Sequence, residues 1–293
     1  MGTSSVVIGG ALVVTLTAAA FAVGRATRKA EAALSPQGGS AQAGLPAGAN
    51  DALDRLSRSP RHGEWVTVKS GQDSIRAWVV YPERSDNAPV VLVVHEIFGL
   101  SAWVRAVADQ LAADGFIAIA PDLLTMKDVA RDANGDTDPN AGRAAIGSLQ
   151  RADIDRHLAA VAEYGMNLPA AKKTYGIVGF CWGGTTSFAH AVASASLGAS
   201  VVYYGSAPVT ESLTSVRAPI LGLYGGADQR VNATIPEAQA KLKELGRTFE
   251  PHIFDRAGHG FLRAQEGNEG ANMEATKQAW PLTVNWFRRY LGA

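Results

Sequence analysis

A glycine-rich turn between an apolar run and a helical pattern constrains the fold of this chain most strongly. The turn spans 179–184 and reads Gly-Phe-Cys-Trp-Gly-Gly; the apolar run 175–178 precedes it, and an alanine-rich helical pattern begins near Thr185. Such a strand-turn-helix unit lifts its central side chain clear of the sheet, at the positive end of the helix. That side chain is Cys181, the only cysteine in the chain, and a helix N-terminus favours the reactive thiolate. The same turn also suits a small buried cysteine with no chemical role.

The chain from about residue 63 alternates between strand and helix patterns. The first two strands flank the turn-rich segment Ser70–Asp73 and predict a hairpin. Predicted strands cover 64–69, 74–81, 90–95, 116–120, 174–179, 200–204, 220–224 and 249–254, and predicted helices cover 101–114, 152–164, 185–195, 235–245 and 272–290. Alternation of this kind predicts an α/β fold, in which a mostly parallel sheet has helices on both faces. Ligands of such sheets bind beyond the carboxyl ends of the strands.

The first 29 residues form a separate targeting segment. Val6–Val23 is uncharged and has about the length of one membrane-spanning helix. The small-x-small sequence Ala20–Ala22 favours a cleaved signal peptide. The basic residues that follow the apolar run favour instead an uncleaved anchor with the next domain in the cytoplasm. We expect a membrane-anchored or exported protein, and both topologies stay open.

A tether joins this segment to the globular domain. Residues 30–62 are rich in Ala, Gly, Ser and Pro, which is typical of a flexible linker, with one short helix around Asp51–Ser57. The domain is predicted to span 63–293.

Charge and cysteine content exclude several classes of partner. The chain has 27 basic and 27 acidic residues, scattered along the sequence, so nothing favours nucleic acid. One cysteine excludes an intrachain disulfide and a cysteine-based zinc site. We expect a monomer that acts on a small molecule and needs no cofactor or metal. The acidic stretch 132–138 resembles the start of a calcium loop, but Thr137 and Arg143 stand where the loop needs glycine and glutamate.

Two later strand ends supply partners for a thiol nucleophile, which needs a base and a group that orients the base. Asp228 closes the turn Gly225-Gly226-Ala227-Asp228, and His259 lies between two glycines after the last predicted strand. Either residue alone is more often an ordinary turn or loop residue. Together with Cys181 they follow the order nucleophile, acid, histidine of α/β-hydrolases. The three positions therefore predict a Cys-His-Asp triad.

The loop after the first buried strand reads His-Glu-Ile-Phe-Gly at 95–99. In an α/β-hydrolase this loop donates one backbone N–H to the oxyanion hole, and the residue after the nucleophile donates the other. The donors are then Ile97 and Trp182. Glu96 points into the same space, where its charge disfavours the thiolate but its carboxylate can accept the thiol proton. The alternative for Glu96 is a surface loop carboxylate.

Four motifs together resemble the dienelactone hydrolase (carboxymethylenebutenolidase) family of α/β-hydrolases. They are Glu96–Gly99, Gly179–Gly184, Gly225–Asp228 and Ala257–Arg263, and the likeness covers residue 63 to the C-terminus. The resemblance implies an α/β-hydrolase fold. The N-terminal hydrophobic segment and the linker depart from the soluble members of the family.

The resemblance also implies a role for each matching residue. Cys181 becomes the nucleophile, His259 the base, Asp228 its orienting partner, and Glu96 the switch that activates the thiol when substrate arrives. Arg263, four residues after the histidine, matches a position that binds the substrate carboxylate; the alternative is a solvated surface arginine. A second such arginine is expected between Thr125 and Arg151. Arg143 is the candidate, in a region that diverges from the family pattern.

These residues predict a hydrolase that cleaves a carboxylic ester or lactone through an acyl-enzyme on Cys181. One alternative is an esterase or related hydrolase that uses the same triad on another class of substrate. The divergent stretch Leu123–Asn140 favours that alternative. The other is a tethered binding module that keeps the fold without turnover.

Overall fold

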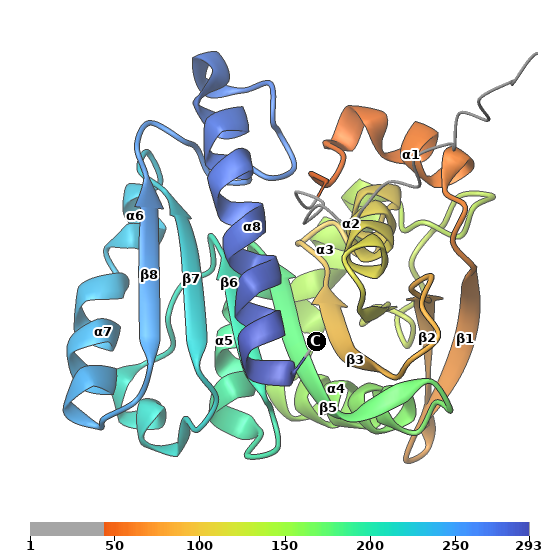
Figure 1. The fold of residues 1–293 in the computed structure, drawn as a ribbon, viewed down its shortest axis with the longest axis horizontal. Helices are drawn as coiled ribbons and strands as arrows, with labels where there is room; N and C mark the ends of the chain where they lie inside the picture. The colour runs from red at the N-terminus through yellow and green to blue at the C-terminus, as the bar shows by residue number, and fades with distance from the viewer. Residues whose placement is uncertain (1–43, 293) are drawn as a thin grey trace, which may run out of the picture. The chain divides into compact units, whose positions relative to one another are not determined.

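The computed structural model describes residues 44–292, and its sheet belongs to a compact unit that spans Ala41–Ala293. One eight-stranded sheet has the order β1-β2-β4-β3-β5-β6-β7-β8 (Figure 1). Its strands are β1 (Gly63–Ser70), β2 (Asp73–Val80), β3 (Ala88–Val94), β4 (Ile117–Pro121), β5 (Ala171–Phe180), β6 (Ala199–Tyr203), β7 (Ile220–Gly225) and β8 (Phe249–Phe254). β1 and β2 form the predicted hairpin, β2 pairs antiparallel with β4, and the remaining pairs are parallel. The predicted α/β fold is confirmed.

Helices cover both faces of the sheet. They are α1 (Ala52–Arg58), α2 (Ala102–Ala113), α3 (Pro139–Ala145), α4 (Arg151–Met166), α5 (Trp182–Ala193), α6 (Gln229–Asn232), α7 (Ile235–Glu244) and α8 (Ala271–Leu291). Short 3-10 turns occur at Ala49–Asp51, Ile146–Ser148, Thr210–Ser215 and Asn268–Gly270. α2 and α8 pack on one face, while α4, α5 and α7 pack on the other (Figure 1). The long helices match their predicted ranges within a few residues, whereas α6 is too short to give a periodic pattern.

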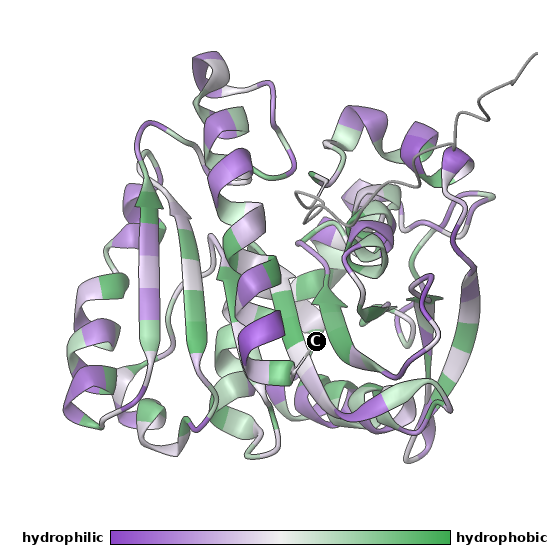
Figure 2. Ribbon diagram, in the orientation of Figure 1, coloured by the Kyte–Doolittle hydropathy of each residue, from purple (hydrophilic) through white to green (hydrophobic). Residues whose placement is uncertain are grey.

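Two apolar cores lie against the two faces of the sheet. One contains Phe116, Phe180 and Phe287 beneath α2 and α8; the other contains Tyr175 and Phe188. All seven residues of β3 are buried because a central parallel strand is covered on both sides. The hydrophobic colouring of the central strands contrasts with the hydrophilic turns of α1 (Figure 2).

The predicted linker is wrong over its second half. Ala49 N–H donates to the carbonyl of Arg263 over 2.9 Å, and the Trp103 indole N–H donates to the carbonyl of Ala47 over 3.1 Å. Ala52 is 1% exposed and packs with α2, in the short helix that the sequence predicted. The sheet-bearing unit therefore begins well before Gly63. A short amphipathic stretch among Ala, Gly and Ser gives little periodic signal, so its docking follows only from the tertiary contacts.

Removing this docked stretch is expected to destabilise the domain. A chain that starts at Gly63 should lose about 2–4 kcal/mol of unfolding free energy relative to one that starts at Gly44. The truncation leaves Asp109, which is 2% exposed, without Arg61 at 2.6 Å and Arg55 at 3.3 Å. Urea unfolding of both chains measures the difference, and equal midpoints and slopes would contradict the expected role.

The predicted targeting segment, residues 1–29, lies outside the described residues. Within 44–292 no helix is both long enough and apolar enough to cross a lipid bilayer.

Candidate active site

The glycine-rich turn is a strained elbow with Cys181 at its apex. β5 ends at Phe180, α5 begins at Trp182, and Cys181 between them has φ 58° and ψ −116°. A Cβ on Gly179 would overlap the carbonyl of Gly183, so this position has no room for a side chain. The positive φ of the turn belongs to Cys181 itself, and Gly179 allows the backbone of β5 to approach that of Gly183 closely. The thiol stands half-buried at the N-terminus of α5.

Asp228 and His259 meet as the sequence predicted. Asp228 follows β7, and His259 lies in the loop after β8. His259 Nδ1 is 2.5 Å from Asp228 Oδ2, and Asp228 is 9% exposed. The Asp228 carboxylate accepts a hydrogen bond from Nδ1–H, so Nε2 of the imidazole is left free to accept a proton.

Cys181, His259 and both predicted oxyanion donors line one pocket of about 230 Å³. The pocket lies where β5, β6 and β7 end, as expected for a parallel sheet. Its lining residues are Ile97, Cys181, Trp182, Thr185, Tyr204, Ser206, Arg230 and His259.

Four of these lining residues are absent from the sequence prediction. Tyr204 is buried, has φ 39°, and stacks edge-on against His259 with ring centroids 5.1 Å apart. It directly follows β6, so its place at the carboxyl end of a strand was the available signal. Arg230 lies two residues after Asp228, and Thr185 and Ser206 are joined by a hydrogen bond from the Ser206 N–H to Thr185 Oγ1. Little in the local sequence separates the last three from ordinary surface residues.

The thiol of Cys181 is protonated more readily than an ordinary cysteine. Burial raises its pKa, and the neighbouring Glu96 carboxylate raises it further. The backbone N–H groups of Trp182 and Ile97, together with Arg230, act in the opposite direction. The expected thiolate preference of a helix N-terminus is thus outweighed, because burial and a like charge both disfavour the anion.

Glu96 is buried rather than displayed on a surface loop. It is 5% exposed, and its Oε2 lies 3.2 Å from Nε of Arg263. Burial raises the pKa of Glu96 to about 7, although Arg263 pulls it downward. The structure therefore pairs the predicted switch with a predicted substrate-binding arginine. The surface alternative is wrong for Glu96, whereas the side chain of Arg263 is 39% exposed.

The two predicted arginines approach the same aromatic ring. The guanidinium carbons of Arg143 and Arg263 each lie 5.0 Å from the ring centroid of Phe98. α3 brings Arg143 there, since a Cβ on Gly142 would overlap the carbonyl of Phe98. A cation over an aromatic face is attracted by the ring, so Phe98 stabilises both guanidinium groups.

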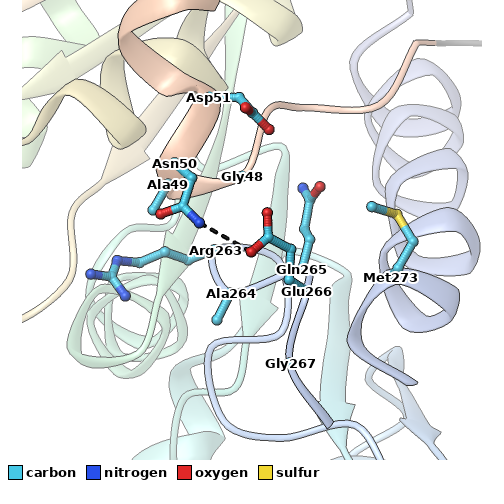
Figure 3. Close-up of a pocket in the computed structure, with 10 residues that line it drawn as sticks. All are labelled: Gly48, Ala49, Asn50, Asp51, Arg263, Ala264, Gln265, Glu266, Gly267 and Met273. Carbon is cyan, nitrogen blue, oxygen red and sulfur yellow. Dashed lines mark hydrogen bonds between the residues drawn. The ribbon is translucent and has the colours of Figure 1, made fainter. Parts of the chain in front are cut away.

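A second pocket, of about 400 Å³, lies between residues 48–51 and residues 263–267 (Figure 3). Asn50 Nδ2 donates to Glu266 Oε2 over 3.2 Å, and the guanidinium of Arg263 extends away from that pair (Figure 3). Gln265 Nε2 also donates to the carbonyl of Pro46 over 2.9 Å. The docked N-terminal stretch therefore supports the backbone of the loop that carries Arg263.

Replacing Glu96 with glutamine is expected to stabilise the protein above neutral pH. A carboxyl with a pKa of 4.5 when unfolded and about 7 when folded binds more protons in the folded state between those values. Wild-type stability therefore falls as pH rises from about 4.5 to 7, by up to about 3 kcal/mol. Glutamine removes this loss, and Arg263, whose side chain is 39% exposed, keeps its contact with water. Melting temperatures at pH 5 and pH 8 measure the effect; a variant less stable than wild type at pH 8 would contradict it.

The sheet order and the elbow after a central strand define an α/β-hydrolase fold. The family model of the dienelactone hydrolases matches residues 75–291, so the chain belongs to that family. A Methylorubrum extorquens protein described as a carboxymethylenebutenolidase is 30% identical to this chain, and the match covers 77% of this chain and 80% of that one. A Salmonella typhimurium protein with the same description is 29% identical, and the match covers 78% of this chain and 87% of that one. A Klebsiella pneumoniae structure described as a dienelactone hydrolase superposes with a TM-score of 0.69 at 26% identity, covering 78% of this chain and 99% of that one. The chain is a hydrolase enzyme.

Proposed function

We propose that this hydrolase cleaves a carboxylic ester or lactone through a thioester acyl-enzyme on Cys181. One observation carries the proposal: the thiol of Cys181, the imidazole of His259 and the residues Ile97 and Trp182 line the same pocket. The hydrogen bond from His259 to Asp228 supports a base that is held in one tautomer.

The resting pairing of Glu96 with Arg263 supports activation by the substrate itself. A substrate carboxylate that binds Arg263 competes with Glu96 for the guanidinium. The released Glu96 carboxylate then accepts the proton of the Cys181 thiol, whose pKa its own charge had raised. The switch keeps the thiol protonated until a suitable anion arrives.

The covalent steps follow from the placement of the remaining groups. Cys181 Sγ attacks the ester carbonyl, and the N–H groups of Ile97 and Trp182 stabilise the tetrahedral oxyanion. The intermediate collapses to a thioester as the C–O bond breaks, and the leaving alkoxide takes the proton that Glu96 had accepted from the thiol. His259 then removes a proton from water, which attacks the thioester and releases the acid and the thiol; Asp228 stabilises the imidazolium.

Three arginines near the pocket favour an anionic substrate. Arg263 and Arg143 flank Phe98, and Arg230 lines the pocket itself. Guanidinium groups bind carboxylates through paired hydrogen bonds. We assign Arg263 and Arg143 to the substrate carboxylate, as in a dienelactone that bears a carboxylate beside its ring.

Replacing Arg263 with glutamine should separate anionic from neutral substrates. For a lactone or ester that carries a carboxylate we expect kcat/KM to fall about 100-fold, because a charged contact worth about 2–3 kcal/mol is lost. For a neutral acetate ester the fall should be within about 5-fold. Arg289→Gln, at an exposed position of α8, is the matched control. An equal fall for both substrates would remove Arg263 from substrate recognition.

Pre-steady-state hydrolysis of a chromogenic acetate ester by the full chain tests the proposed function. We expect a burst of product of about one equivalent per Cys181, followed by slower turnover. Dienelactone and a panel of neutral esters then identify the substrate class. Turnover of neutral esters alone would favour the esterase alternative. An absence of both burst and turnover with every member of the panel would overturn the proposal in favour of a binding module.

We also propose that residues 1–29 anchor the protein to a membrane or direct its export. The uncharged run Val6–Val23 supports this location. N-terminal sequencing of protein from fractionated cells distinguishes a cleaved signal from an anchor, and an intact soluble chain would refute both. We propose a monomer, which light scattering of the purified protein tests.

A further inference from the structure

We propose that His95 is a positioning residue that holds both donors of the oxyanion hole in place. This role deepens the proposed function, because it assigns the group that orients the amides of Ile97 and Trp182. The sequence places His95 directly after β3, beside the predicted switch, with no role of its own.

The first contact fixes the peptide that contains one donor. His95 Nδ1 lies 2.8 Å from the carbonyl oxygen of Glu96, and that carbonyl belongs to the same peptide group as the Ile97 N–H. Nε2 of the ring accepts a hydrogen bond from the Leu123 N–H over 3.3 Å. Since Nε2 is an acceptor, the neutral ring carries its proton on Nδ1, and Nδ1 donates to Glu96. Polarising that carbonyl also strengthens the N–H on the other side of the peptide group.

The second contact fixes the residue that carries the other donor. The imidazole of His95 stacks on the indole of Trp182, with centroids 5.5 Å apart and planes 14° from parallel. The elbow also approaches the end of β3 closely at Gly183, where a Cβ would overlap the carbonyls of Val94 and His95. One ring therefore touches the oxyanion loop on one side and the nucleophile elbow on the other.

Burial makes this arrangement rigid. His95 is 0% exposed, and burial lowers its pKa, so the ring stays neutral and keeps the Nδ1–H donor. A preorganised donor pair stabilises a developing oxyanion without reorganisation during the reaction. A loose pair stabilises it less, so His95 acts on the acylation step through Ile97 and Trp182.

Two isosteric substitutions separate the two hydrogen bonds of the ring. The amide of Asn in His95→Asn lies near the position of Nδ1 and can donate to Glu96, whereas the amide of His95→Gln reaches the position of Nε2 and can accept from Leu123. For His95→Gln we expect the burst rate constant with a chromogenic acetate ester to fall about 30–100-fold, and for His95→Asn about 10-fold or less. Alkylation of Cys181 by iodoacetamide passes through no oxyanion, so its limiting rate at high pH should stay within about 2-fold of wild type in both variants.

Several results would overturn the proposal. They are an unchanged burst rate in His95→Gln, a larger loss in His95→Asn than in His95→Gln, or a parallel loss of burst and limiting alkylation rate. If His95→Gln does not fold, Trp182→Leu tests the stacking contact alone, and an unchanged burst rate in that variant counts against the proposal. If wild type gives neither burst nor turnover with any ester of the panel, the proposed function fails. The pH at the midpoint of the alkylation profile then still shows whether the donors are in place, because loss of the Ile97 N–H contact raises the pKa of the thiol. A midpoint in His95→Gln equal to that of wild type would overturn the role of His95.

Discussion

Cys181→Ala is expected to abolish the burst and to lower kcat for ester hydrolysis by about 10⁴-fold or more. Alanine cannot form the thioester, and the remaining groups accelerate only the direct attack of water. The loss should be confined to chemistry, because Cys181 is half-buried and alanine removes only the sulfur atom, which faces the backbone N–H groups of Trp182 and Ile97. Single-turnover kinetics and thermal unfolding of the same preparations measure both quantities.

Cys181→Ser is the companion variant. Its hydroxyl fits the same elbow but is far less acidic than a thiol, so a weak buried base such as Glu96 activates it poorly. We expect turnover well below wild type and above Cys181→Ala. A burst of normal size in Cys181→Ala would place the nucleophile elsewhere, and no other cysteine exists in the chain to take its place.

Asp228→Asn is expected to lower kcat by about 10³–10⁴-fold while leaving KM within a few-fold. Asparagine keeps the shape of the side chain but no longer holds the Nδ1 proton or stabilises the imidazolium of His259, 2.5 Å away. Deacylation should suffer most, since His259 activates the attacking water in that step. A burst followed by almost no turnover is therefore the expected trace.

Asp255→Asn provides the matched control for this variant. Asp255 lies in the loop just before His259, its side chain is 94% exposed, and it pairs only with Arg256 in the described part of the chain. We expect its turnover within about 2-fold of wild type. Equal losses in the two variants would mean that the effect of Asp228→Asn comes from a charge change and not from the orientation of His259.

Local patterns predicted most of the fold because each pattern reports its own element. The uninterrupted apolar run of β3 and the alternation of strands and helices required a covered parallel sheet. The glycines of the elbow could be recognised in the sequence because they are clustered at the one turn where backbone segments approach each other closely. Docking of Gly44–Ser59 was not readable, since Ala47 and Ala49 act through their backbone groups, which every sequence has.

The candidate site divides in the same way. Cys181, Asp228 and His259 were predictable because each stands at a strand end within a glycine-rich motif. Tyr204 and Arg230 were not, because they reach the pocket from positions with no local motif. The pairing of Glu96 with Arg263 joins residues 167 positions apart, so proximity alone reveals it.

The sequence by itself determined the order of the elements, the elbow and the positions of the candidate reacting groups, because these depend on neighbours along the chain. Only the tertiary structure decided the protonation of these groups and the contacts that hold them in place. Burial and the Glu96 carboxylate, which is itself paired with Arg263, outweigh the helix N-terminus at the thiol. The ring of His95 connects β3, the elbow and Leu123 at a point where three distant segments meet. Burial and charge act through space, so they are set only when the chain has closed around the site.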